Sequence, residues 1–225
     1  MDLKERVFKN IDERKEKVLK GEINSIPSPF KRFSNDYIGL EKGKYYVCTA
    51  NTKVGKTTFA SFLFLYSPLL YAYNHRNTIR FKVFYYPLEE TQEDVLYRFM
   101  CFALYYLSKG KIVIDRNDLK SSKNVPLSDE IRSYMDNPEY QSLIDFFIEN
   151  VTFSTSTNPS GVWKEMVRYA EDNGTVFKKK VQVKDEFGVN QEIEVFDHYE
   201  ANDPNEVKLI FFDHVSLVSL ERGFD

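Results

Sequence analysis

The stretch Tyr45–Phe59, which reads YYVCTANTKVGKTTF, restricts the possible folds of this chain more than any other. Residues 50–57 follow the pattern G-x-x-x-x-G-K-[ST], with Ala50 in the first glycine position. The apolar run Tyr45–Cys48 predicts a strand before this loop, and the apolar residues from Phe59 to Leu65 predict a buried helix after it. Strand, loop and helix in this order favour a phosphate-binding loop over a chance match.

The chemistry of such a loop assigns a role to each of its residues. Backbone N–H groups at a helix start cradle phosphate oxygens, and a glycine at Gly55 lets the backbone approach them. We expect Lys56 to reach the β- and γ-phosphates and the Thr57 hydroxyl to hold Mg²⁺. Ala50 fits the first position only if its φ stays negative. The predicted nucleotide-binding residues are Ala50, Asn51, Thr52, Lys53, Val54, Gly55, Lys56, Thr57 and Thr58.

Composition and charge exclude several classes of protein. The chain has 225 residues and a net charge of −3, so a nucleic-acid site would have to be a local patch. No charge-free apolar run reaches the length of a membrane span, and the charged N-terminus lacks a signal-peptide pattern. Cys48 and Cys101 both lie in apolar stretches and favour buried, reduced thiols. We therefore expect a cytoplasmic protein with no membrane partner.

A pair of carboxylates follows the next predicted strand. Phe81–Tyr86 is apolar and runs into Pro87-Leu88-Glu89-Glu90, after which Thr91 begins a capping pattern for a long helix. Ligands of open α/β sheets bind at the carboxyl ends of strands, which favours a catalytic role for Glu89 or Glu90. The alternative is that both acids only complement the positive end of the following helix.

A further carboxylate, Asp213, ends the predicted strand Val207–Phe212. An Asp after four apolar strand residues resembles the Walker B arrangement, in which the carboxylate orients Mg²⁺ or its waters. The three histidines, at 75, 198 and 214, lack partners at the spacing of metal ligands.

The remaining segments complete the outline. Residues 2–20 predict an amphipathic helix that either packs on its own domain or docks on a neighbouring subunit. Residues 25–30 predict an extended linker and residues 109–127 a surface loop. Further helices are expected near 128–135, from Pro138, and from Pro159 to Asn173, with Trp163 as a core anchor. Val151–Thr155 predicts a strand, and residues 176–196 a locally basic β-hairpin around the turn 185–188.

Together these segments resemble the RecA-like ATPase core of the DnaB family of hexameric replicative helicases, over roughly residues 1–220. The resemblance rests on SIPSPFKRFSNDYIGLEKGKYYVCTANTKVGKTTFA, on FYYPLEETQEDVLYRFM and on LIFFDHVSLV. It implies a three-layer α/β P-loop NTPase with a mostly parallel sheet, a linker helix and Pro-rich linker at 1–29, and a core at 30–225 carrying an inserted hairpin at 175–197. It also implies that Glu89 polarises the attacking water and that Asp213 orients Mg²⁺.

The family's properties define the expected function. The resemblance implies ATP and Mg²⁺ as ligands, single-stranded DNA as a partner, a homo-oligomeric ring of six subunits, and the cytoplasm of a bacterial or phage-infected cell. A RecA/RadA recombinase, a KaiC-like ATPase and a non-catalytic module that regulates or loads a helicase remain alternatives. A nucleoside or shikimate-type kinase is disfavoured because the Walker B position lies far downstream and no lid-like arginine cluster is present.

One departure from the family concerns the end of the sequence. The family carries a further strand, a polar sensor, DNA-contacting loops and an arginine finger after Walker B, whereas this sequence ends twelve residues after Asp213. We expect a fragment, or a core completed by a second chain or by strand donation, and weak ATPase activity for the isolated chain. Loss of an arginine finger acting from the neighbouring subunit typically costs about 10³–10⁵ in rate.

Overall fold

The structure, a computed structural model, describes residues 2–51, 53–184 and 190–219. The chain divides into two compact units. The larger unit contains residues 1–154 and 207–213, and the smaller unit contains residues 155–206 and 214–225. No helix in the described chain is both long and apolar enough to cross a bilayer.

The larger unit is an α/β structure. Its helices are α1 (Leu3–Leu19), α2 (Lys56–Ala60), the π-helix η1 (Ser61–Tyr66), α3 (Ser67–Asn74), α4 (Gln92–Leu107), α5 (Arg116–Leu119), α6 (Asp129–Met135) and α7 (Pro138–Asn150). Its strands are β1 (Ser25–Pro27), β2 (Gly39–Glu41), β3 (Arg80–Pro87), β4 (Val151–Phe153) and β7 (Glu206–Asp213).

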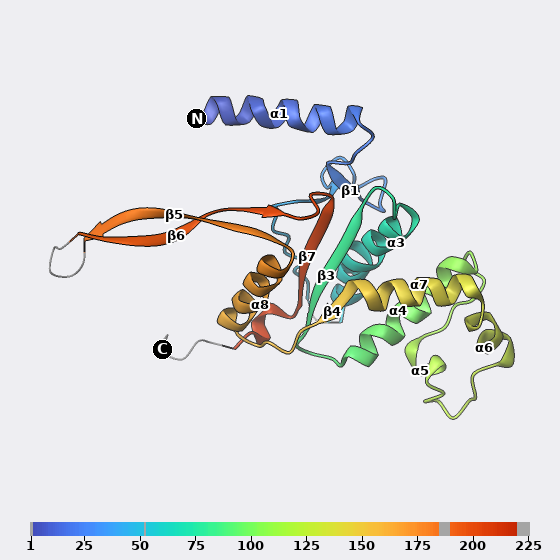
Figure 1. Cartoon of the computed structure of the whole chain (residues 1–225). Coiled ribbons are helices and arrows are strands. Elements are labelled where there is room, and N and C mark those ends of the chain that lie inside the picture. Colours follow the sequence, from blue (N-terminus) through green and yellow to red (C-terminus); the bar gives the residue numbers. More distant parts are fainter. Residues whose placement is uncertain (1, 52, 185–189, 220–225) are drawn as a thin grey trace. The chain divides into compact units, whose positions relative to one another are not determined.

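A three-stranded parallel sheet in the order β4-β3-β7 lies at the centre of this unit (Figure 1). The predicted strands at 81–86, 151–155 and 207–212 form it, each within two residues of the expected bounds. β3 is apolar along most of its length, which suits a strand that is buried between two neighbouring strands and under helices. Tyr85 is fully buried and stacks on Phe211 of β7, with 4.9 Å between ring centroids.

The helices α4 and α7 provide much of the core. Phe99 of α4 stacks on Phe147 of α7 with 4.2 Å between ring centroids, and both side chains are fully buried. The helix starts are those the sequence predicts, since the side chains of Thr91 and Asn137 each accept a backbone hydrogen bond in the first turn. The prediction of a loop at 109–127 is incomplete, because the Asp115 side chain caps the short helix α5 within it.

The predicted strand at Tyr45–Cys48 is wrong. Residues 44–50 form no strand, and the side chains of Tyr45 and Val47 are 86% and 64% exposed. The segment is held instead by Tyr46, whose hydroxyl donates to the Gly39 carbonyl and accepts from the Glu41 N–H, both at 3.0 Å. An apolar run becomes a strand only where a neighbouring strand offers a ladder of hydrogen bonds, and the described sheet offers none to this run.

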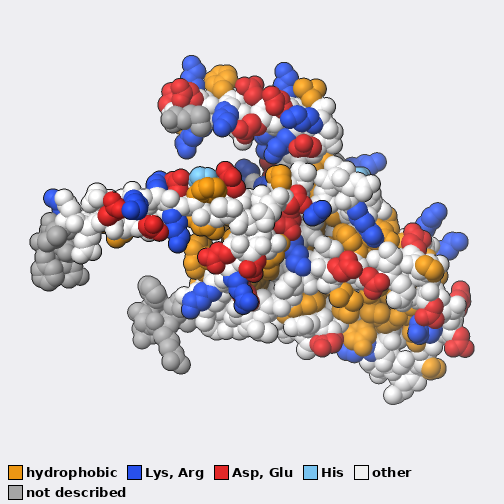
Figure 2. All heavy atoms as spheres, in the orientation of Figure 1, with side chains coloured by type: hydrophobic (Ala, Val, Ile, Leu, Met, Phe, Trp, Pro, Cys, Tyr) orange, Lys and Arg blue, Asp and Glu red, His pale blue; other side chains and the backbone are white. Residues whose placement is uncertain are grey.

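The N-terminal helix α1 confirms the predicted amphipathic helix. Asp2 and Glu5 form a capping box at its start, and Arg14 Nη1 donates to Glu41 Oε2 of β2 at 2.8 Å. None of its residues is buried, and Val7 and Ile11 of the apolar stripe are exposed. Acidic and basic side chains are interspersed along it (Figure 2).

The smaller unit consists of α8 (Pro159–Asp172), an antiparallel ribbon of β5 (Gly174–Lys184) and β6 (Asn190–Ala201), and the 3₁₀-helix η2 (Val215–Leu217). The ribbon confirms the predicted hairpin, whose turn at 185–188 lies outside the described residues. Trp163 is 70% exposed, so its prediction as a core anchor is wrong. The reason is that α8 buries none of its residues, because a two-stranded ribbon does not provide a core that could enclose them.

Candidate functional site

A cleft of about 790 Å³ in the larger unit lies between the residues that follow the predicted loop and the start of α4. Thr57 and Thr58 line it from the loop side, and Glu89 and Glu90 line it from the end of β3. Its volume lies in the range of small-molecule sites. The residues around it are Thr57, Thr58, Phe62, Tyr66, Glu89, Glu90, Arg98, Cys101, Phe102, Tyr105, Asp115, Arg116 and Asn117.

The predicted phosphate-binding loop has the backbone geometry of a tight turn into a helix. Gly55 precedes α2 with φ of 87°, and Lys53 also has positive φ, at 64°. Ala50 does not have positive φ, which meets the condition for an alanine at that position. Thr52 lies outside the described residues. The helix continues from α2 through six residues of π-helix, and Phe62 and Tyr66 of this π-helix reach the cleft.

The predicted loop residues are distributed unevenly with respect to the cleft. Ala50, Asn51, Lys53, Val54 and Gly55 are exposed, and Thr57 and Thr58 are the loop residues that line the cleft. Lys56 is half-buried next to them at the first position of α2. The described loop residues before Lys56 are therefore exposed.

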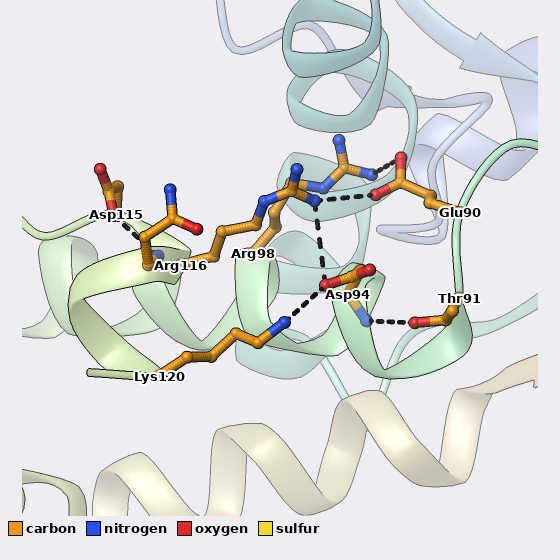
Figure 3. Close-up of polar contacts among 8 residues, drawn as sticks. Glu90, Thr91, Asp94, Arg98, Asp115, Arg116 and Lys120 are labelled. Atoms are coloured by element: carbon orange, nitrogen blue, oxygen red, sulfur yellow. Dashed lines mark hydrogen bonds and ion pairs between the residues drawn. The ribbon is translucent and has the colours of Figure 1, made fainter. Parts of the chain in front are cut away.

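The two adjacent acids after β3 differ in their surroundings. Glu89 is exposed and lines the cleft. Glu90 is mostly buried, and its Oε1 accepts a hydrogen bond from Arg98 Nη2 at 2.5 Å (Figure 3). The sequence pattern pointed to both acids, but it gave no sign of this ion pair. Arg98 is a residue of the site that sequence reasoning missed.

Glu90 also lies beside Asp213, which ends β7. Burial raises the pKa of Glu90, and the Asp213 carboxylate raises it further, both through its negative charge and through a hydrogen bond between the two side chains. Arg98 lowers this pKa but does not cancel the two effects. The structure thus connects two of the predicted elements, because Glu90 lies on the cleft with Thr57 and next to Asp213.

Several buried polar atoms around this carboxyl pair have no hydrogen-bond partner in the described chain. They include Asp213 Oδ2, Arg98 Nε and the hydroxyls of Tyr66 and Tyr85. Asp213 is itself 5% exposed. Buried polar atoms are almost always satisfied, and unsatisfied ones commonly mark a place for water or an ion. The acid predicted to orient Mg²⁺ therefore offers an oxygen that nothing in the described protein uses.

Thr57 and Asp213 carry oxygens of the kind that Mg²⁺ binds beside a phosphate ligand, and Asp213 adjoins the cleft through Glu90 without lining it. The described residues contain no group of three or more His, Cys, Asp or Glu side chains that could hold a metal. Mg²⁺ does not require such a group, because it takes one or two protein oxygens and completes its octahedron with waters and substrate phosphates. The Thr57 hydroxyl and the free oxygen of Asp213 are the protein oxygens that would hold it.

Polar contacts continue from Glu90 along α4 and α5. Arg116 Nη1 lies 3.7 Å from Glu90 Oε2 and 3.9 Å from Asp94 Oδ1, and Lys120 Nζ lies 3.1 Å from the same Asp94 oxygen (Figure 3). The Lys120 hydrogen bond lowers the pKa of Asp94. Arg116 and Lys120 come from a segment that the sequence indicated only as a polar loop, so no sequence signal located them.

Cys101 lines the same cleft as a free thiol. Burial, assisted by the charges of Asp115 and Asp118, raises the pKa of this thiol to about 11. It is therefore protonated at neutral pH and weakly nucleophilic. Cys48 is also free, so neither of the two cysteines is in a disulfide, although both are only partly buried.

The comparisons with known proteins do not extend these observations. No protein-family model, no curated protein and no solved structure matches the chain.

Proposed function

We propose that this chain binds Mg–ATP in the cleft between residues 50–58 and the end of β3 and hydrolyses it. The observation that supports this most is the convergence of three separate sequence signals. Thr57 and Thr58 share a cleft with Glu89 and Glu90, and Glu90 lies beside Asp213. A chance match to the loop pattern would have no reason to share a cleft with the two acids that follow β3.

Each residue has a definite part in this proposal. Lys56 and the N–H groups at the start of α2 bind the phosphates, while Thr57 and Asp213 hold Mg²⁺, which neutralises charge on the phosphates. Glu89 is exposed to the cleft and orients a water for attack on the γ-phosphorus. The bond from that phosphorus to the β–γ bridging oxygen breaks, the proton of the water is released toward Glu89, and ADP and phosphate leave.

We further propose that this hydrolysis serves a RecA-like motor of the DnaB helicase type, which translocates on single-stranded DNA as a ring of six subunits. This step depends on the family resemblance. The helix α1 is compatible with it, since its exposed apolar stripe is suited to packing on an adjacent subunit. The neighbouring chain would supply the arginine finger, so turnover by the isolated chain should be slow.

A binding experiment tests the central part of the proposal. Isothermal titration of the purified chain with ATPγS and Mg²⁺ should show saturable binding, and Lys56→Ala should weaken it by about a hundredfold, which corresponds to about 2.7 kcal/mol. Lys53→Ala is the matched control, because Lys53 lies in the same loop but is exposed and precedes α2, whereas Lys56 is half-buried at the first position of that helix, next to Thr57 of the cleft. Equal losses in the two variants would contradict a specific role for Lys56.

A second candidate function is a nucleotide-binding module without turnover. The pairing of Glu90 with Arg98 favours it, because this carboxylate is held by a cation, which leaves Glu89 as the acid of the two that could orient a water. Hydrolysis by the wild type that is lost in Glu89→Gln, with ATPγS binding retained, would exclude this second function. Unwinding and strand-exchange assays on the assembled protein then separate a helicase from a RecA-type recombinase.

A further inference from the structure

Arg116 extends into the cleft from a helix that is firmly fixed at its start. It is the first residue of α5, and the Asp115 side chain accepts hydrogen bonds from the N–H groups of Asn117 and Asp118. Lys123 holds both of these aspartates, with contacts of 3.0 and 2.7 Å. Arg116 and Asn117 line the same cleft as Thr57 and Thr58. The backbone from which the Arg116 side chain extends is therefore held in place without any ligand.

The charges around Arg116 leave it weakly held. Glu90 has a closer cation in Arg98, at 2.5 Å, and Asp94 has a closer cation in Lys120, at 3.1 Å. Arg116 lies 3.7 and 3.9 Å from these two carboxylates, beyond hydrogen-bond distance. Within this network of Glu90, Asp94, Arg98, Arg116 and Lys120, three cations contact two carboxylates, and Asp213 adds a third carboxylate beside Glu90 (Figure 3).

Exposure distinguishes the two arginines of the network. The Arg116 side chain is 44% exposed, whereas that of Arg98 is 22% exposed. Arg98 is committed to Glu90, and moving it would leave a mostly buried carboxylate without its partner. Arg116 can turn toward an anion in the cleft without such a cost, because the carboxylates near it keep their closer cations.

We propose that Arg116 binds the terminal phosphate of the nucleotide in this cleft and makes the site prefer a triphosphate over a diphosphate. A guanidinium carries five N–H donors in a planar fork that matches phosphate oxygens, and it remains charged at any physiological pH. The inference rests on the proposed nucleotide site and adds to it a residue in cis that senses the γ-phosphate. The competing explanation is that Arg116 only ties α5 to α4, in which case both nucleotides would be affected equally.

The test is the ratio of two affinities, measured by isothermal titration of the full chain with ATPγS and with ADP in the presence of Mg²⁺. Arg116→Ala should weaken ATPγS binding by about tenfold to a hundredfold, the value of a charge-assisted hydrogen bond, and leave ADP binding within about twofold. Arg116→Lys, which keeps the charge and loses the fork, should fall between the wild type and Arg116→Ala. Lys120→Ala is the matched control, because Lys120 belongs to the same network but does not line the cleft.

Each other outcome has a distinct meaning. An Arg116→Ala variant that loses ATPγS and ADP affinity by the same factor, or loses neither, overturns the inference and leaves the proposed nucleotide site intact. A Lys120→Ala variant that changes the ratio as much as Arg116→Ala also overturns it, because the effect would then belong to the network as a whole. A wild-type chain that binds neither nucleotide overturns the proposed function and this inference together.

Discussion

The two sides of the cleft are built in different ways. On one side, α4 buries Val95, Phe99 and Ala103 in the core and fixes Arg98 against Glu90. On the other side, residues 44–51 and 53–55 form neither helix nor strand, and Tyr45 and Val47 are largely exposed. The first side obtains its geometry from core packing. The second side forms no inter-strand hydrogen bonds of its own. We therefore expect substitutions there to act on ligand binding much more than on folding.

The largest expected effect is on the α4 side. Phe99→Ala should lower the free energy of unfolding by about 3–5 kcal/mol, because it empties a fully buried position between Phe147 and Tyr66. Urea unfolding followed by circular dichroism measures this change. Phe8→Ala on α1 is the control, and its exposed ring should contribute less than about 0.5 kcal/mol. Similar losses in the two variants would remove the distinction between core and surface.

Hydrogen exchange with and without nucleotide tests the difference between the loop side and the α4 side of the cleft. With ATPγS at a hundred times its Kd, amides that exchange only after ligand release should gain up to about a hundredfold protection, equivalent to about 2.7 kcal/mol. We expect this gain to be concentrated in residues 50–58, whereas the buried half of α4 should change little because packing already protects it. A gain confined to α4 would contradict the proposed binding loop.

The pH dependence of stability should have opposite signs for two acids of the α4 side. The pKa of Glu90 is raised by burial, so its contribution to stability is complete at low pH and is lost as pH rises through its folded-state pKa. The pKa of Asp94 is lowered by Lys120, so its contribution is complete above its unfolded-state pKa and is lost as pH falls. Urea midpoints of Glu90→Gln and Asp94→Asn between pH 3 and pH 8, relative to the wild type, should diverge in these two directions. A common direction for both variants would show that one of the two environments is misassigned.

The smallest expected effect lies in the exposed segment. Val47→Ala should change the free energy of unfolding by less than about 0.5 kcal/mol, because its side chain is 64% exposed and forms part of no strand. The measurement is again urea unfolding, with Val83→Ala in the fully buried centre of β3 as the contrasting variant. A loss of more than about 2 kcal/mol at Val47 would place this segment in a core, as the sequence pattern had suggested.

Local signals predicted most elements of the larger unit. The caps at Thr91 and Asn137, the apolar face of α4 and the strands at 81–86 and 207–212 all involve neighbours close in sequence or a continuous apolar run. Tyr45–Cys48 has the same apolar character as these strands, but its state depends on a neighbouring strand that its own residues do not specify. The prediction of Trp163 as a core anchor was wrong for a similar reason. Amphipathic spacing shows which face of α8 is apolar, but it does not show whether anything covers that face.

The site was predictable in its motifs and not in its ion pairs. Lys56, Thr57 and Asp213 were singled out because phosphate and metal chemistry require particular residues in particular places, and their roles as ligands stay predictions. Arg98 stands four residues after Asp94, a spacing that favours a pair between them on a helix, yet it contacts Glu90 before the helix begins. Arg116 reaches Glu90 from a different helix, and such a contact depends on tertiary packing alone.

The magnesium dependence of nucleotide binding tests most directly whether the loop and Asp213 act on one ligand. ATPγS affinity should be measured by titration with Mg²⁺ and with EDTA, in the wild type and in Asp213→Asn. We expect Mg²⁺ to strengthen binding to the wild type by about tenfold or more and to have much less effect on the variant, which lacks the carboxylate charge that we propose holds the metal. The same gain from Mg²⁺ in both proteins would show that Asp213 and the loop around Lys56 do not share a Mg–nucleotide.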